Sequence, residues 1–129
     1  MKFLWTSEYS VGDDTLDRQH QHLFGLGNTI EDAPLAEGKH YVMELYRYAR
    51  EHFTEEEAHM AEIGFPALPE HRELHTRLCQ DFNAVIEDGF SDEGDFLKFK
   101  EFLYGWLTSH VMKFDRRYCD FAKRVQAEA

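Results

Sequence analysis

The sequence predicts an all-α protein, namely an up-down-up-down antiparallel four-helix bundle with an N-terminal arm and a short C-terminal helical extension. Two observations support this fold class. Four segments repeat apolar residues at spacings of three and four, which is the pattern of a helix with one buried face. Short connections that contain Gly or Pro separate them, and short connections favour antiparallel neighbours. We expect the 129 residues to form a single domain, residues 1–129.

The arm is predicted from Met1 to about Thr15, and it ends in Asp13-Asp14-Thr15, which are residue types typical of helix N-caps. The first helix is predicted from about Leu16 to Ala33, with Pro34 and Gly38 flanking the break after it. Its apolar stripe consists of Leu16, His20, Leu23, Phe24, Gly27 and Ile30.

The second helix is predicted from about Lys39 to Ile63. Gly64 ends it, and the connection that follows contains Pro66 and Pro69. Its stripe consists of Val42, Leu45, Ala49, His52, Phe53, Glu56, Met60 and Ile63. The third helix is predicted from about Glu70 to Asp88, with a stripe made of His71, Leu74, His75, Leu78, Phe82, Val85 and Ile86.

The fourth helix is predicted to start near Asp95, after a loop over residues 89–94. Its stripe consists of Phe96, Phe99, Leu103, Trp106, Leu107, His110, Val111 and Phe114. The last stretch, from Asp115 to about Gln126, forms the extension, and the pattern leaves open whether it continues the fourth helix or turns away.

Composition narrows the classes of partner and compartment. The net charge is −11, with 25 acidic against 14 basic residues, which argues against nucleic acid or an anionic membrane as a partner. No run approaches the roughly 20 apolar residues of a membrane span, and the first seven residues are too short an apolar stretch for a secretory signal. Cys79 and Cys119 lack CxxC spacing, so we expect free thiols in the cytoplasm, with one disulfide as the alternative.

Each predicted helix carries at least one metal-ligand residue type on its apolar stripe. Residues four apart share a helix face, so the HxxxE and HxxxH pairs can each reach one metal or a close metal pair. Buried imidazoles and carboxylates are costly without a partner. A hydrogen-bonded core histidine explains any single case, but a bound cation explains the whole set. The candidate metal ligands are His20, His52, Glu56, His71, His75, His110 and Asp115.

Asp115 departs from helical spacing. Five residues correspond to about 140° around an ideal helix, so Asp115 should point away from His110. Either the helix is distorted there, as in a π-bulge, or Asp115 enters from the edge of the site. The remaining histidines, His22, His40 and His59, are expected at the surface or rim.

These motifs resemble the signature of the hemerythrin family, which is H, HxxxE, HxxxH and HxxxxD. They are His20, His52-Phe-Thr-Glu-Glu56, His71-Arg-Glu-Leu-His75 and His110-Val-Met-Lys-Phe-Asp115. The opening resembles that of the bacterial members, the bacteriohemerythrins, at Trp5, Val11-Gly12 and Leu16-Asp17-Arg18-Gln19-His20. The resemblance spans almost the whole chain. It implies a four-helix bundle that holds two iron ions (Fe2+/Fe3+) with a bridging oxo or hydroxo group.

The resemblance also implies roles for the seven residues. His71, His75 and His110 would hold one iron, His20 and His52 would hold the other, and Glu56 and Asp115 would bridge the two. The second iron would then be five-coordinate, and dioxygen would bind there as a hydroperoxide. A dry pocket is expected around this position, and the candidates to line it are Leu23, Phe24, Trp106, Leu107 and Val111.

The function that this resemblance implies is reversible binding of dioxygen for storage, delivery or buffering, without enzymatic turnover. Three alternatives remain open at this point. The chain could be an oxygen or redox sensor that acts through a protein partner. It could be a di-iron peroxidase or a nitric-oxide-reactive enzyme. Iron storage or handling is the fourth function, and the single closed site disfavours it.

Overall fold

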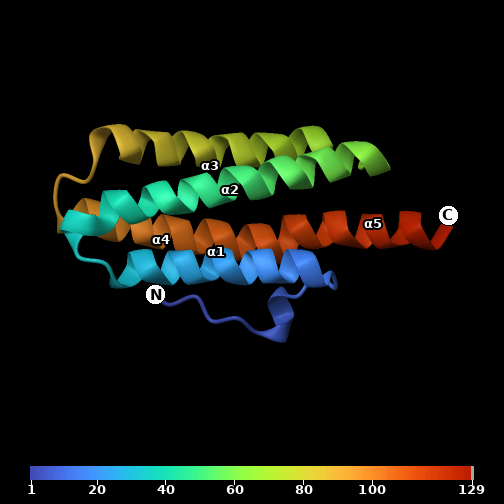
Figure 1. Ribbon diagram of the computed structural model, residues 1–129, viewed down its shortest axis with the longest axis horizontal. Helices are drawn as coiled ribbons and strands as arrows, with labels where there is room; N and C mark the ends of the chain where they lie inside the picture. Colours follow the sequence, from blue (N-terminus) through green and yellow to red (C-terminus); the bar gives the residue numbers. More distant parts are fainter. Residues whose placement is uncertain (129) are drawn as a thin grey trace.

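The computed structural model describes residues 1–128, so Ala129, the last residue of the expected domain, lies outside the described range. Within that range the chain is helical and contains no strands (Figure 1). No described helix combines the length and apolar character needed to cross a membrane. The elements are η1 (Ser7–Tyr9), α1 (Asp14–Asp32), α2 (Leu35–Ile63), α3 (Leu68–Asp88), α4 (Glu93–Ser109), η2 (His110–Asp115) and α5 (Arg116–Glu128).

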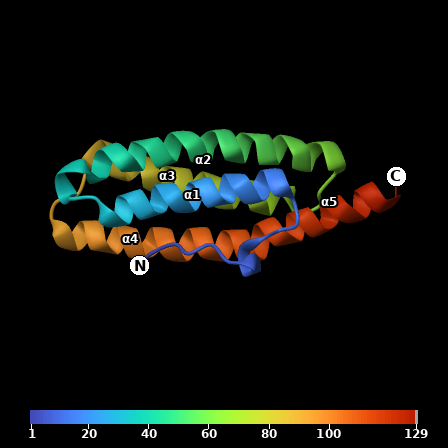
Figure 2. The same cartoon turned by 60° about the horizontal axis from the view of Figure 1, so that its bottom comes forward.

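The four long helices α1 to α4 form the predicted bundle. Successive helices run in opposite directions, and α5 extends beyond the bundle at the C-terminal end (Figures 1 and 2). The helix α2 packs against both α1 and α3, and α4 packs against α1. The arm runs across α1 and α4 (Figure 2). The predicted up-down-up-down bundle with an N-terminal arm and a C-terminal helical extension is therefore confirmed.

The helices α1 and α4 begin two residues earlier than predicted, and an aspartate N-cap explains each start. Asp13 accepts a hydrogen bond from the backbone N–H of Leu16 at 2.9 Å. Asp92 does the same for Asp95 at 2.8 Å. Each cap satisfies an N–H that the helix itself leaves unpaired, so the helix can start at the residue after the aspartate.

The helices α2 and α3 also begin earlier, because residues that the sequence marks as breakers lie inside them. Pro34 is the N-cap of α2, and Pro69 lies in the first turn of α3, where a missing N–H has no cost. The prediction that Gly38 flanks the break is wrong. Gly38 is buried within α2, and a Cβ there would lie 2.8 Å from the Phe96 ring, so this glycine lets α2 and α4 approach closely. Gly64 ends α2 in a left-handed conformation, as predicted.

The core has two parts, and the candidate ligands lie between them. The larger part fills the bundle and consists of residues such as Leu23, Phe53, Leu78 and Leu107. The smaller part contains Val11, Met60, Phe65, Tyr118 and Cys119. Along α1, along α2, along α3 and along the continuous stretch from α4 through η2 to α5, the predicted ligands fall between residues of one part and residues of the other. Apolar side chains therefore enclose the polar cluster from both ends.

The arm is fixed along α1 by one aromatic side chain and one amide. The ring of Phe3 packs directly over Gly27 and lies 5.0 Å from the ring of Phe24, measured between centroids. Asn28 accepts from the Phe3 backbone N–H at 2.6 Å and donates to the Phe3 carbonyl at 2.9 Å. Arg116 in α5 donates to backbone carbonyls of the arm. These contacts tie the first residues to both ends of the bundle.

The junction of α4 and α5 is a π-helix from His110 to Asp115. The polypeptide continues through it without a turn, so α5 prolongs α4 beyond the other helices (Figure 1). Of the two explanations for the five-residue spacing, the structure confirms a helix distortion. Such single-turn π segments are frequent at functional sites.

Candidate metal centre

The seven candidate ligands lie together in the middle of the bundle, and each is 3% exposed or less. They come from α1, α2, α3 and from η2, which continues α4. Their ligand-type atoms form two overlapping groups, each within 4.8 Å. We call one the three-histidine group, His71, His75 and His110, and the other the two-histidine group, His20 and His52. Glu56 and Asp115 belong to both groups.

The three-histidine group converges on one point through its Nε2 atoms. The Nε2 of His110 lies 3.1 Å from that of His71 and 3.2 Å from that of His75. A metal–imidazole bond of about 2.1 Å with ligands at right angles gives a nitrogen–nitrogen separation of about 3.0 Å. The observed spacing therefore suits three imidazoles around one metal ion.

Each carboxylate turns one oxygen toward each group. Glu56 Oε1 lies 3.3 Å from the Nε2 atoms of both His71 and His75, while its Oε2 lies 3.2 Å from Nε2 of His52. The two carboxylate oxygens of Asp115 also face different groups. Its Oδ1 lies 3.1 Å from His71 Nε2, and its Oδ2 lies 3.0 Å from His20 Nε2. Two carboxylates arranged in this way could each contact two neighbouring cations.

The helix geometry explains how these side chains come to face one another. On α2 and α3 the HxxxE and HxxxH pairs lie one turn apart on the inner face. On η2 the wider π turn aligns residues five apart, as an α turn aligns residues four apart. Asp115 Oδ1 consequently lies 3.2 Å from His110 Nε2.

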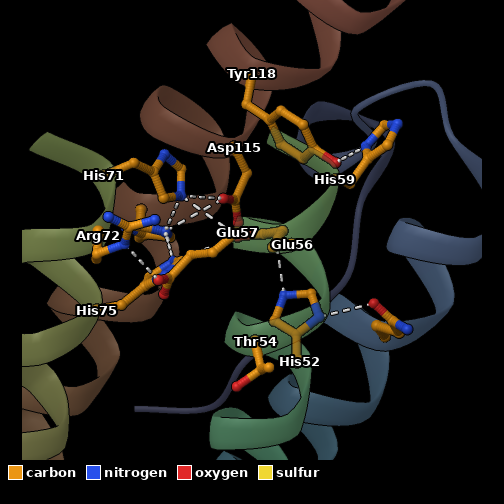
Figure 3. A network of polar contacts seen from close by, with 12 residues as sticks. His52, Thr54, Glu56, Glu57, His59, His71, Arg72, His75, Asp115 and Tyr118 are labelled. Atoms are coloured by element: carbon orange, nitrogen blue, oxygen red, sulfur yellow. Dashed lines mark hydrogen bonds and ion pairs between the residues drawn. The ribbon is translucent and has the colours of Figure 1, made fainter. Parts of the chain in front are cut away.

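Two side chains that the sequence analysis did not single out contact the outer faces of the imidazoles. His52 Nδ1–H donates to Gln19 Oε1 at 2.7 Å. His75 Nδ1–H donates to Glu57 Oε2 at 2.9 Å (Figure 3). Both acceptors are oxygens without a proton to give, so each ring must carry its proton on Nδ1. The Nε2 of a neutral ring then has a free lone pair, which is the form that binds a metal.

No short spacing in the sequence signals these two contacts. Gln19 precedes the candidate ligand His20 in the chain, and Glu57 follows the candidate ligand Glu56. Each of the two nevertheless contacts a histidine on a different helix. The run of three glutamates around Glu56 also favours a solvated face. Glu57 is partly exposed, yet its carboxylate reaches inward to His75.

Aromatic rings hold two of the imidazoles in place. Phe53 stacks on His75 with centroids 3.8 Å apart and planes within 6°. Trp106 stacks on His110 with centroids 4.5 Å apart and planes within 8°. Of the predicted lining residues, Leu23, Phe24, Leu107 and Val111 are buried, and Trp106 is partly exposed. The rings are therefore oriented by packing as well as by hydrogen bonds.

Charge in the cluster is balanced between carboxylates and imidazoles. Burial alone raises the pKa of Glu56, but contacts with His20 and three further imidazoles outweigh it and lower the pKa well below its ordinary value. The pKa of Asp115 is lowered despite burial by the nearby imidazoles. In turn, Asp115 and Glu56 outweigh the burial of His20 and His71 and raise their pKa values to about 10 and about 9. Without a metal, protons on these two rings therefore take the place of cations.

Those protons leave much of the cluster unsatisfied. Several solvent-inaccessible atoms make no hydrogen bond in the described part of the chain, although most of them lie within ion-pair distance of other atoms of the cluster. They are both oxygens of Glu56, Oδ1 of Asp115 and both nitrogens of His20. Buried polar atoms are otherwise nearly always paired. Imidazole nitrogens and carboxylate oxygens are the donor types of divalent transition metals. The residues therefore fit a pair of such ions.

The other three histidines lie outside the cluster, at the rim as predicted. The ring of His22 lies against Tyr48, and His40 pairs with the exposed Glu44 on the same helix. Nδ1 of His59 is hydrogen-bonded to the hydroxyl of the buried Tyr118 (Figure 3). Both Cys79 and Cys119 are free thiols.

Comparison with known proteins identifies the family of the chain. The family model of the hemerythrin HHE cation binding domain matches residues 11–122. A bacteriohemerythrin of Clostridium acetobutylicum is 29% identical over 131 residues, which cover 92% of this chain and 99% of the relative. A myohemerythrin of Riftia pachyptila is 30% identical over 90% of each chain, and a hemerythrin-like protein of Naegleria gruberi is 29% identical over 90% of each. The match covers most of the chain and the entire buried cluster, so this chain belongs to the hemerythrin family.

Proposed function

We propose that the chain binds dioxygen reversibly at a non-haem di-iron centre, for storage, delivery or buffering, and that residues 1–129 act as one hemerythrin-like domain. The observation that carries the proposal is the orientation of the two carboxylates. Glu56 and Asp115 each direct one oxygen to the three-histidine group and the other to the two-histidine group. This favours two ions that share bridging ligands over two independent sites.

In this proposal His71, His75 and His110 hold one iron ion, and His20 and His52 hold the other. When bound, the iron pair, with its bridging oxo or hydroxo group, supplies the electrons for reversible binding of dioxygen. The two-histidine group offers one donor fewer than the three-histidine group, which supports access for dioxygen on that side.

The surrounding residues support binding rather than turnover. Five imidazoles and two carboxylates form the cluster, and neutral ligands stabilise highly oxidised iron less than anionic ligands do. Leu23, Leu107 and Val111 are almost completely buried, so they exclude water from the interior. Excluding water limits proton entry, and protons favour the loss of reduced oxygen as peroxide. The free thiols of Cys79 and Cys119 support a reducing compartment such as the cytoplasm.

Metal analysis after anaerobic loading with ferrous iron tests the di-iron centre. The proposal requires two iron ions per chain, and one ion per chain would contradict the bridging arrangement. Incubation of the loaded protein with hydrogen peroxide or nitric oxide then distinguishes a binder from an enzyme. Stoichiometric reaction without sustained turnover supports oxygen binding, whereas sustained turnover of either substrate would favour the peroxidase or nitric-oxide function.

A further inference from the structure

The outer Nδ1 atoms of the clustered imidazoles differ in their partners. One ring of each group donates from Nδ1 to a side chain, namely His52 to Gln19 and His75 to Glu57. The Nδ1 atoms of His20 and His110 have no such partner among residues 1–128. In each histidine group, one imidazole therefore donates its Nδ1 proton to a side-chain acceptor. The chemical nature of this acceptor differs between the two groups.

The group behind His75 is a carboxylate that is fixed in position. Glu57 Oε2 accepts from His75 at 2.9 Å, while Glu57 Oε1 accepts from Arg72 Nε at 3.1 Å (Figure 3). The side chain of Glu57 is 21% exposed, so it is mostly withdrawn from solvent. The guanidinium orients the carboxylate, which presents a full negative charge to the ring N–H.

The group behind His52 is a neutral amide. Gln19 Oε1 accepts from His52 at 2.7 Å, and its Nε2 donates to Glu55 Oε2 at 3.3 Å. The second bond fixes which end of the amide faces the ring, because a carboxylate can only accept. His52 thus has an oriented acceptor at Nδ1, as His75 has, but this acceptor carries no charge.

The difference between the two acceptors acts through the rings on the metal ions. A hydrogen bond to an ionised acceptor is stronger than one to a neutral acceptor, and it draws the Nδ1 proton away from the ring. The ring gains negative charge, and its Nε2 becomes a stronger donor toward a metal. This effect strengthens the three-histidine group, which already offers more donor atoms than the two-histidine group.

We propose that Glu57 and Gln19 are positioning residues that make the two halves of the centre unequal. The three-histidine group then binds its metal ion first and more tightly, and the two-histidine group keeps the weaker, more exchangeable ion. This inference rests on the proposed di-iron function, and it adds an order of loading and a division of roles between the two ions. The more weakly held ion lies on the side proposed for dioxygen.

Anaerobic titration with cobalt(II) against a competing chelator tests the inference, because cobalt(II) reports its own binding through visible absorption. The wild-type protein should bind two ions in two separate steps. Glu57→Gln keeps the shape and an accepting oxygen but removes the charge. This variant should weaken the tighter step by about 10–100-fold and leave the weaker step unchanged. Glu73→Gln, which removes the same charge from an exposed ion pair on α3, is the matched control and should change neither step.

The reciprocal variant exchanges the amide that accepts from His52 with the carboxylate that this amide contacts. Gln19→Glu together with Glu55→Gln places a carboxylate on the ring and an amide beyond it, so the hydrogen bond between positions 19 and 55 is kept. This variant should strengthen the weaker step by about tenfold and leave the tighter step unchanged. The two variants together assign each step to its group, and a merely structural defect would instead weaken both steps together.

The outcomes separate this inference from the proposed function. If Glu57→Gln leaves the tighter step unchanged, or weakens both steps by the same factor, the inference is wrong while the di-iron function stands. If the wild-type protein binds two ions with equal affinity, the inference is likewise wrong. If the wild-type protein takes up no second ion, the proposed di-iron function itself fails.

Discussion

The Nε2 of His110 lies 3.2 Å from Oδ1 of Asp115, although the two residues are five apart in one uninterrupted helix. In an α-helix, residues five apart point about 140° away from each other. The π-helical segment from His110 to Asp115 removes this difference and turns both side chains into the bundle. The distortion therefore belongs to the site, because it gives one helix both an imidazole and a carboxylate that faces both histidine groups.

Removing the carboxylate of Glu56 tests the bridge. Glu56→Ala should reduce the iron content from two ions per chain to one or none, because both groups lose an oxygen that lies 3.2–3.3 Å from their Nε2 atoms. Metal analysis after anaerobic loading measures the loss. Glu62→Ala, at an exposed position of the same helix, is the control and should keep two ions. Full iron content in Glu56→Ala would rule out the bridging role.

Leu107 provides a test of water exclusion. It is 2% exposed and lies one turn before His110 on α4. Leu107→Asp should speed autoxidation of the oxygenated protein, because a buried carboxylate draws water and protons toward the centre. The rate is measured from the decay of the oxygenated spectrum in air. Thr108→Asp, about 100° away on the same helix, is the control. Equal rates in Leu107→Asp and the wild type would remove Leu107 from the lining.

The metal-free protein should lose stability at alkaline pH. His20 and His71 have pKa values of about 10 and about 9, against 6.5 ordinarily, so their contribution is complete below pH 6.5 and disappears as the pH rises through these values. Glu56 and Asp115 have lowered pKa values, so their contribution is present above about pH 4.5 and disappears in acid.

Denaturant unfolding of the metal-free protein measures this dependence. The free energy of unfolding should fall by on the order of 2–5 kcal/mol between pH 6.5 and pH 10. The iron-loaded protein should not show this alkaline loss, because bound metal replaces the two protons. A metal-free protein that is equally stable at both pH values would contradict the charge balance described for the cluster.

Replacement of two glycines of α1 by alanine should have opposite effects on the stability of the protein. A Cβ at Gly27 would lie 2.4 Å from the ring of Phe3, whereas a Cβ at Gly25 meets nothing within 4 Å. Gly27→Ala should destabilise the protein by about 1–3 kcal/mol, because the arm must move. Gly25→Ala should stabilise it by about 0.5–1 kcal/mol through helix propensity. Thermal unfolding of both variants provides the comparison. Equal effects would show that the packing of the Phe3 ring does not require a glycine at position 27.

The sequence predicts the bundle and the clustering of the seven residues because both follow from helical spacing. An apolar stripe determines which face is buried, so a histidine on the stripe must point inward. The contacts of Gln19 and Glu57 depend on how neighbouring helices are rotated and offset, and no spacing within one helix encodes that. Gly38 illustrates the same limit, because its role inside α2 is to make room for the ring of Phe96 from α4, and that contact between two helices is not encoded within either helix. The π segment was one of two explanations that spacing alone allowed.

Visible absorption through one cycle of oxygenation tests the central claim most directly. The protein is loaded anaerobically with ferrous iron, and its spectrum is recorded before oxygen, after oxygen and after removal of oxygen. Reversible binding predicts two irons per chain and a visible band that appears with oxygen and disappears on its removal over repeated cycles. Two irons that oxidise at once and never return to the colourless state would contradict reversible binding and would indicate redox or peroxide chemistry at this centre.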